Sequence, residues 1–159
     1  MAIQTFKSSA KVNAPKEMAG AITSVEQAAD PIYVLAIRFY EAKNYPKALR
    51  LMEYLLRSQK PQLRYLRTTA IILQADQQLE NALSFYMRAA ALDAEKDPRI
   101  TLGQAQCLVM LKQYPEALPY LEETWDRLKN PALSAQLRNE LVKICSPLME
   151  RVQELSKAA

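Results

Sequence analysis

The stretch Lys43-Asn-Tyr-Pro-Lys-Ala-Leu49 decides the fold, because related stretches recur twice further along the chain. The two relatives are Gln77-Gln-Leu-Glu-Asn-Ala-Leu83 and Lys112-Gln-Tyr-Pro-Glu-Ala-Leu118. Their shared alanines are spaced 34 and 35 residues apart, at Ala48, Ala82 and Ala117. Twelve residues before each lies a second alanine, at Ala36, Ala70 and Ala105. Small residues at both places let two antiparallel helices approach closely, so the sequence predicts a helical hairpin repeated three times.

The composition favours an all-α fold. Only two glycines occur in 159 residues, far below the usual share of about 7 %. Tight β-hairpin turns depend on residues with positive φ, chiefly glycine, so a hairpin-rich β fold is disfavoured. Half of the residues are apolar, which is typical of a globular domain.

Local signals predict where the helices begin. Asp30-Pro31 and Asp97-Pro98 each combine an N-cap aspartate with a proline in the first turn, and Pro46 and Pro115 start two further helices. The repeats are therefore expected to span residues 30–130, with helices at 31–42, 46–58, 62–76, 80–92, 98–112 and 115–128. Large apolar residues, Leu35 and Phe39 among them, are expected in the core between paired helices.

Segments on both sides complete the predicted organisation. Residues 131–159 form a C-terminal helix with one apolar stripe, which either caps the repeats or serves self-association. Ser146-Pro147 predicts a kink or a restart in this helix. The stripe consists of Leu133, Leu137, Leu141, Ile144, Leu148, Val152 and Leu155. Residues 1–14 are expected to be a flexible arm, and residues 15–29 a short helix with Met18, Ile22 and Val25 on one face.

The residues needed for familiar chemistry are missing from the sequence. There is no histidine, no glycine-rich phosphate loop and no Cys cluster with metal-ligand spacing. We therefore expect no enzyme activity, no catalytic, cofactor-binding or metal site, and no cofactor. Cys107 and Cys145 fall at apolar helix positions and are expected to be buried thiols. No run approaches the roughly 18 apolar residues of a membrane span, so a cytoplasmic protein without membrane insertion is expected.

Helix phase predicts which side chains face the inside of the stacked hairpins. These candidate peptide-binding residues are Tyr33, Ile37, Tyr40, Arg64, Arg67, Ile71, Gln74, Arg99, Leu102 and Gln106, with Val109 at the next turn. Tyrosines and aliphatic residues offer apolar contact area, whereas arginines and glutamines can hydrogen-bond a peptide backbone. The alternative is that the aliphatic residues belong to the core and the arginines are a solvated face.

The pattern over residues 30–130 resembles the tetratricopeptide repeat. More closely, Ala36-Ile-Arg-Phe-Tyr40 with its following turn, and the stretch from Arg99 to Met110, resemble the first and third repeats of class II chaperones of bacterial type III secretion. The resemblance implies a groove that holds an extended segment of a hydrophobic translocator protein, with Tyr33 and Tyr40 contributing most. It also implies a possible homodimer through the N-terminal helix.

Two other functions remain open at this point. A tetratricopeptide scaffold or adaptor would be incorporated permanently into a multi-protein assembly and would release no client. A nucleic-acid-binding module would show affinity that falls steeply with salt. The net charge of +4 is mild for this length, so no nucleic-acid partner is expected.

Overall fold

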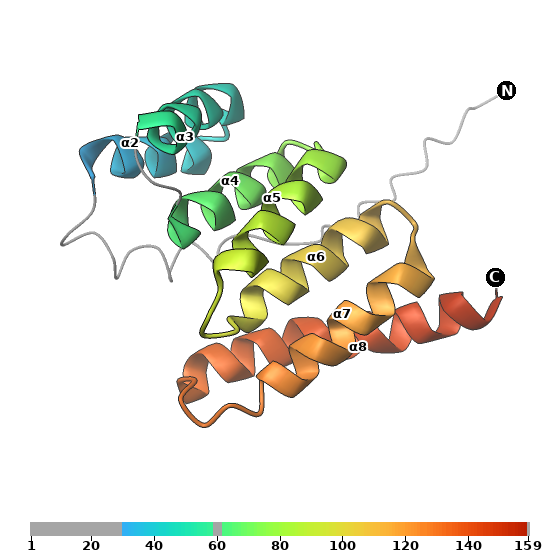
Figure 1. Cartoon of the computed structure of the whole chain (residues 1–159). Helices are drawn as coiled ribbons and strands as arrows, with labels where there is room; N and C mark the ends of the chain where they lie inside the picture. Colours follow the sequence, from blue (N-terminus) through green and yellow to red (C-terminus); the bar gives the residue numbers. More distant parts are fainter. Residues whose placement is uncertain (1–29, 59–61, 159) are drawn as a thin grey trace, which may run out of the picture.

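The computed structural model describes residues 30–58 and 62–158. The predicted arm at 1–14 and the predicted helix at 15–29 lie outside the described residues. The described part consists of α-helices without strands, so the expected all-α class is confirmed (Figure 1). The helices are α2 (Pro31–Glu41), α3 (Tyr45–Ser58), α4 (Leu63–Ala75), α5 (Leu79–Leu92), α6 (Pro98–Met110), α7 (Tyr114–Arg127) and α8 (Ala135–Ala158).

The helices form three consecutive hairpins followed by α8. Within the hairpins, α2 contacts α3, α4 contacts α5, and α6 contacts α7. Each hairpin then packs on the next, through α3 with α4 and α5 with α6, and α8 covers α7 at the end of the row (Figure 1). The first helices also meet directly, α4 with α6 and α6 with α8. A stack of this kind is a solenoid whose first helices line one side.

The alanines of the repeat lie where the hairpins are tightest. All six, Ala36, Ala48, Ala70, Ala82, Ala105 and Ala117, have no exposed surface. A larger side chain at any of them would push paired helices apart, because protein interiors are close-packed. The prediction that small residues allow close helix approach is confirmed.

The two Asp-Pro sequences cap helices as expected. The backbone N–H of Ile32 donates to Asp30 Oδ1 at 2.8 Å, and that of Arg99 donates to Asp97 Oδ1 at 2.9 Å. Each satisfies one of the free donors of a helix N-terminus. Proline follows at the first position of both α2 and α6, where no N–H is needed.

The three hairpin turns end their first helices in the same way. Lys43, Gln77 and Lys112 have φ values of 58°, 63° and 62°. In the first turn Lys43 N–H donates to Tyr40 O, and Asn44 N–H donates to Phe39 O at 2.8 Å. The same pair of bonds recurs at the other two turns. This is the Schellman motif, in which glycine is the usual residue at the left-handed position.

Leu35 does not lie in the core, so its expected place there is wrong. Its side chain is 43 % exposed, whereas Phe39 is half-buried against the core. The repeat spacing relates Leu35 to Thr69 and Gln104, which are both buried. These two lie on helices that have a hairpin before them, whereas no described helix precedes α2. Leu35 is exposed because it lies at the end of the described stack.

Helix α8 runs without interruption through Pro147, so of the predicted kink or restart the restart is wrong and the kink stays a prediction. Proline removes one helical N–H and crowds the carbonyl four residues earlier, which here belongs to Lys143. Both residues are exposed, so water can satisfy that carbonyl. The buried side of α8, with Leu141, Cys145 and Val152, is unaffected. None of the described helices is long and apolar enough to cross a membrane.

Candidate peptide-binding face

The predicted binding residues fall into repeated positions on the first helices. Position by position, α2, α4 and α6 supply Tyr33, Arg67 and Leu102; then Ile37, Ile71 and Gln106; then Tyr40, Gln74 and Val109. Arg64 and Arg99 occupy one further shared position, one turn earlier. We call these eleven residues the inner face. They are offset in phase from the alanines, which face the partner helix of the hairpin.

Most of the inner face is packed rather than open. The apolar members Tyr33, Ile37, Tyr40, Ile71 and Leu102 are buried, as are the two glutamines, whereas the three arginines and Val109 are half-buried. The aliphatic residues of the inner face therefore belong largely to the core, as the alternative in the sequence analysis stated. What the inner face can offer a ligand is its polar groups and the edges of its rings.

An aromatic cluster joins α2 to α4 at one end of the inner face. The ring centroids of Tyr33 and Tyr65 are 5.5 Å apart, and the Tyr33 hydroxyl bonds to Thr68 Oγ1 at 2.9 Å. The guanidinium of Arg64 lies 5.6 Å and 4.8 Å from these two ring centroids. It also donates to the Tyr65 hydroxyl at 3.0 Å, while its Nε finds no partner in the described chain. That N–H is buried as well as unpaired, so a peptide carbonyl reaches it only if the side chains that cover it move.

A hydrogen-bonded row crosses from α5 through α4 to α6. The Tyr86 hydroxyl donates to Gln74 Oε1 at 2.9 Å, and Gln74 Nε2 donates to Gln106 Oε1 at 3.4 Å. Tyr86 belongs to a second helix and reaches this row only because α6 carries Gly103, where an added Cβ would lie 2.3 Å from Tyr86 Cζ. Burial raises the pKa of Tyr86 well above 10, so the hydroxyl keeps its proton.

Tyr40 contributes a buried hydroxyl without a hydrogen-bond partner among the described residues. Its ring packs 6.0 Å from that of Tyr45, and burial raises its pKa to about 12. A buried hydroxyl left unpaired is costly and rare in folded proteins. Tyr40 is therefore the strongest candidate on this face for a bond to an incoming peptide.

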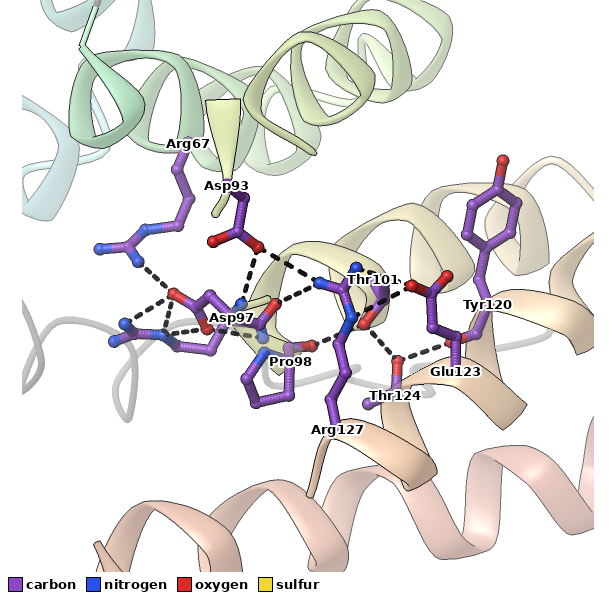
Figure 2. Close-up of polar contacts among 10 residues, drawn as sticks. Arg67, Asp93, Asp97, Pro98, Thr101, Tyr120, Glu123, Thr124 and Arg127 are labelled. Carbon is purple, nitrogen blue, oxygen red and sulfur yellow. Dashed lines mark hydrogen bonds and ion pairs between the residues drawn. The ribbon is translucent and has the colours of Figure 1, made fainter. Parts of the chain in front are cut away.

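Two predicted arginines are engaged inside the chain (Figure 2). Arg67 Nη1 lies 2.6 Å from Asp97 Oδ2, and Arg99 Nη2 lies 2.7 Å from the same oxygen. Burial alone would raise the pKa of Asp97, but the hydrogen bonds and charge of Arg99, with the charge of Arg67, hold it below the usual value. The protein itself therefore supplies a carboxylate partner for these two arginines.

The same joint extends to α7 through Asp93 and Arg127. Asp93 Oδ2 accepts the backbone N–H of Asp97 at 2.7 Å and Arg127 Nη1 at 3.3 Å. Arg127 also donates to the Asp97 carbonyl at 3.1 Å and to Glu123 at 2.7 Å (Figure 2). These contacts tie the second hairpin to the third. Sequence reasoning predicted Asp97 only as a helix cap and did not identify Asp93 or Arg127, because nothing in a single repeat shows which hairpins these residues connect.

A shallow depression lies elsewhere, between α7 and α8, beside Trp125 and Val142. Arg138 lines it, but its guanidinium donates to the carbonyls of Leu128 at 3.0 Å and Asn130 at 2.8 Å. These bonds satisfy acceptors at the end of α7. Arg138 therefore fastens the α7–α8 turn, and the other charged residue that lines the depression, Lys129, is paired with Asp126. In the described residues no cluster of acidic or Cys side chains could hold a metal ion.

The chain resembles known proteins in its structure but not detectably in its sequence. No protein-family model and no curated protein sequence matches the chain. The type III secretion chaperone SycD of Yersinia enterocolitica, in complex with a peptide of the translocator YopD, matches at TM-score 0.70 and 24% identity, covering 82% of this chain and 93% of SycD.

Two further structures agree with this match. PcrH from Pseudomonas aeruginosa, in complex with the chaperone-binding region of PopD, has a TM-score of 0.69 and 20% identity, covering 84% of this chain and 93% of PcrH. A type III secretion complex from Aeromonas hydrophila matches at TM-score 0.72 and 19% identity, over 89% of this chain and 90% of that one. This protein has the tetratricopeptide-like helical fold of these translocator chaperones.

Proposed function

We propose that this protein is a bacterial cytoplasmic chaperone of type III secretion. It binds an extended segment of a hydrophobic translocator on the inner face and keeps that protein soluble before export. The observation that carries the proposal is the shared fold over most of both chains, because SycD and PcrH with this fold are seen in complex with translocator segments. Two general observations agree with the proposal. SycD and its neighbours are chaperones rather than enzymes, and no described helix could span a membrane.

The chemistry of the inner face supports an extended, partly apolar ligand. The Tyr40 hydroxyl and Arg64 Nε lack partners in the described chain, and an extended peptide has carbonyls to offer both. The ring edges and aliphatic side chains between them supply apolar contact. Covering apolar segments of a membrane-inserting client would protect it from aggregation. The bound segment needs no unfolding, so the proposal requires no nucleotide.

Co-expression with a translocator encoded by a neighbouring gene tests the proposal directly. We expect a soluble stoichiometric complex, and an insoluble translocator when the chaperone is absent. A translocator that stays insoluble despite co-expression would contradict the proposal. A complex that forms permanently within a larger assembly, without release of the translocator, would instead favour the scaffold function.

The binding role of Tyr40 is best tested with Tyr40→Phe. Replacement by alanine would also remove a buried ring, which costs about 3 to 5 kcal/mol of stability and confuses loss of binding with unfolding. Phenylalanine keeps the ring and removes only the unpaired hydroxyl. We expect unchanged or slightly raised stability and translocator-peptide affinity lowered about tenfold, measured by calorimetric titration. The matched control is Tyr54→Phe on the exposed side of α3, for which no change is expected.

A further inference from the structure

The inner face carries three arginines near the starts of its second and third helices, with fewer carboxylates beside them. Arg64 and Arg67 lie one turn apart at the start of α4, so their side chains are neighbours, and Arg99 lies in the first turn of α6. Arg67 and Arg99 share one carboxylate oxygen of Asp97, at 2.6 Å and 2.7 Å. The first turn of α4 contains no acidic residue. This edge of the inner face therefore carries an excess of positive charge.

Arg64 is the arginine of this group that has no carboxylate partner. None of the ion pairs between described residues includes it. Asp30, at the start of α2, accepts the N–H of Ile32 and forms no ion pair with Arg64. Arg64 is nevertheless half-buried, and a cation that is partly removed from water is costly unless an anion compensates the lost hydration.

The nitrogens of the Arg64 guanidinium differ in what they can offer a ligand. Nη2 donates to the Tyr65 hydroxyl at 3.0 Å, and Nε is buried without a partner. Nη1 makes no hydrogen bond in the described chain and, unlike Nε, reaches the surface. A ligand on the inner face therefore meets Arg64 at Nη1, without any movement of the side chains that cover Nε.

Two tyrosine rings hold the guanidinium in place. Its central carbon lies 5.6 Å from the ring centroid of Tyr33 and 4.8 Å from that of Tyr65. The Tyr33 ring is itself fixed, because its hydroxyl bonds to Thr68 Oγ1 at 2.9 Å. Cation–π contacts of this kind replace part of the lost hydration but supply no negative charge. The cation is therefore preorganised at the junction of α2 and α4, so less side-chain entropy is lost when it binds an anion.

We propose that Arg64 binds a carboxylate side chain of the translocator segment through Nη1, so that the inner face selects segments with an acidic residue beside their apolar anchors. The inference rests on the proposed function and adds a chemical requirement for the client. A carboxylate suits this position better than a backbone carbonyl, because hydrogen bonds between ionised groups are stronger than those to neutral acceptors. Arg67 and Arg99 attract the same carboxylate at longer range but remain bound to Asp97.

The spacing of the helices places the acidic residue within the client. Packed helices lie about 8 to 10 Å apart, and an extended chain advances about 3.3 Å per residue. A segment that crosses the inner face from helix to helix therefore advances about three residues between neighbouring helices. The acidic residue opposite Arg64 is then expected about three residues from a client side chain that contacts α2 or α6.

A double-mutant cycle between the full chain and its client tests the pairing. The probes are synthetic peptides that tile the translocator encoded by the neighbouring gene, titrated calorimetrically at low salt. In the tightest-binding peptide each acidic residue is replaced in turn by its amide. We expect one such replacement to weaken binding to the natural chain about tenfold and to have no effect on binding to Arg64→Gln. The affinity ratio is taken on one protein at a time, so any change in the folded fraction of Arg64→Gln cancels.

Two further variants sharpen the test. Arg50→Gln removes the same charge from an exposed position of α3 outside the inner face and should leave peptide affinity unchanged. Arg64→Glu should bind the natural peptide more weakly still, and should bind better when lysine replaces the acidic residue of the peptide.

The outcomes separate this inference from the proposed function. If Arg64→Gln weakens the acidic peptide and its amide form equally, Arg64 only shapes the inner face, and the inference is overturned while the chaperone function stands. A tightest-binding peptide without an acidic residue overturns it in the same way. If neither the peptides nor the intact translocator bind the chain, both proposals are wrong.

Discussion

At the scale of single residues, glycine at the left-handed turn positions would make the folded chain more stable than the residues present there. Lys43, Gln77 and Lys112 have positive φ, where a side chain costs about 1 kcal/mol or more relative to glycine. We expect Lys112→Gly to raise the free energy of unfolding by about 0.5 to 1 kcal/mol, after allowing for the greater entropy of glycine in the unfolded chain. Urea denaturation measures this. Lys143→Gly in the exposed interior of α8 is the control and should lower stability by about 1 kcal/mol.

Gly103 is the opposite case, a residue whose replacement the packing forbids. Alanine in place of glycine usually stabilises a helix by about 0.5 to 1 kcal/mol. Here the new Cβ would lie 2.3 Å from Tyr86 Cζ, so we expect Gly103→Ala to destabilise the chain by about 1 to 3 kcal/mol. The same change in a Tyr86→Leu background should cost clearly less. Equal costs in the two backgrounds, measured by thermal unfolding, would mean that the ring is not the obstacle.

Two residues, Tyr86 and Leu35, show what the repeat pattern in the sequence could not predict. The alanine phase was enough to predict the helices and the close approach within each hairpin, whereas the binding role of the inner face stays a prediction. Tyr86 occupies a predicted core position, but its hydrogen bond to Gln74 was not predicted, because the hydroxyl reaches that residue from a second helix only where Gly103 of another hairpin leaves room for the ring. Leu35 was misplaced because the repeat pattern describes a middle repeat, whereas α2 stands at the end of the described stack.

At the scale of elements, the joint between the second and third hairpins depends on ionised Asp97. The lowered pKa of Asp97 means that its carboxylate is favoured in the folded state. Its stabilising contribution is complete above the pKa of the unfolded chain, about 3.9, and disappears as the pH falls through the lower folded value. We expect Asp97→Asn to cost about 3 kcal/mol at pH 7, since it leaves Arg67 and Arg99 without their carboxylate.

Acid should erase most of that difference. As the pH falls below about 3.9 the wild-type carboxylate is protonated first in the unfolded chain and then, below the lower folded pKa, in the folded chain, and from there on both proteins lack the charge. Urea denaturation of the two proteins at pH 7 and at low pH measures the change. A constant difference at both pH values would show that the hydrogen bonds, rather than the charge, hold the joint. Asparagine still caps helix α6, so loss of the cap does not explain the expected effect.

At the scale of the whole molecule, α8 acts as half of a fourth repeat. It contacts both α7 and α6, as α6 contacts α5 and α4, but no further helix covers it in the described chain. Its free side carries polar residues such as Asn139, Lys143 and Glu150, all exposed. A polar outer side is what a solenoid needs at its last repeat. The structure therefore accounts for the apolar stripe of α8 as packing against α7 and its neighbours, which favours the capping role over self-association through this helix.

The described core consists of two clusters along the stack, and this division predicts which helices lose stability when a core side chain is removed. One cluster holds the first two hairpins, and the other holds parts of α6 together with α7 and α8. In a solenoid each repeat is stabilised mainly by its neighbours, so a cavity at one end should not loosen the other end equally. Leu141→Ala in α8 removes a buried side chain and should cost about 2 to 5 kcal/mol locally. Hydrogen exchange should then speed up in α7 and α8 while α2 and α3 keep their protection.

Leu55→Ala in α3 provides the mirror experiment, because Leu55 is fully buried at the other end of the stack. Its cavity should speed up exchange in α2 and α3 and leave α8 protected. Uniform acceleration in both variants would mean that the chain opens only as a single unit. The joint at Asp97 sets how sharply the two ends separate, since it is a charged connection between the second and third hairpins. Asp97→Asn should therefore confine the effect of Leu141→Ala further, with even less acceleration in α2 and α3 relative to α8.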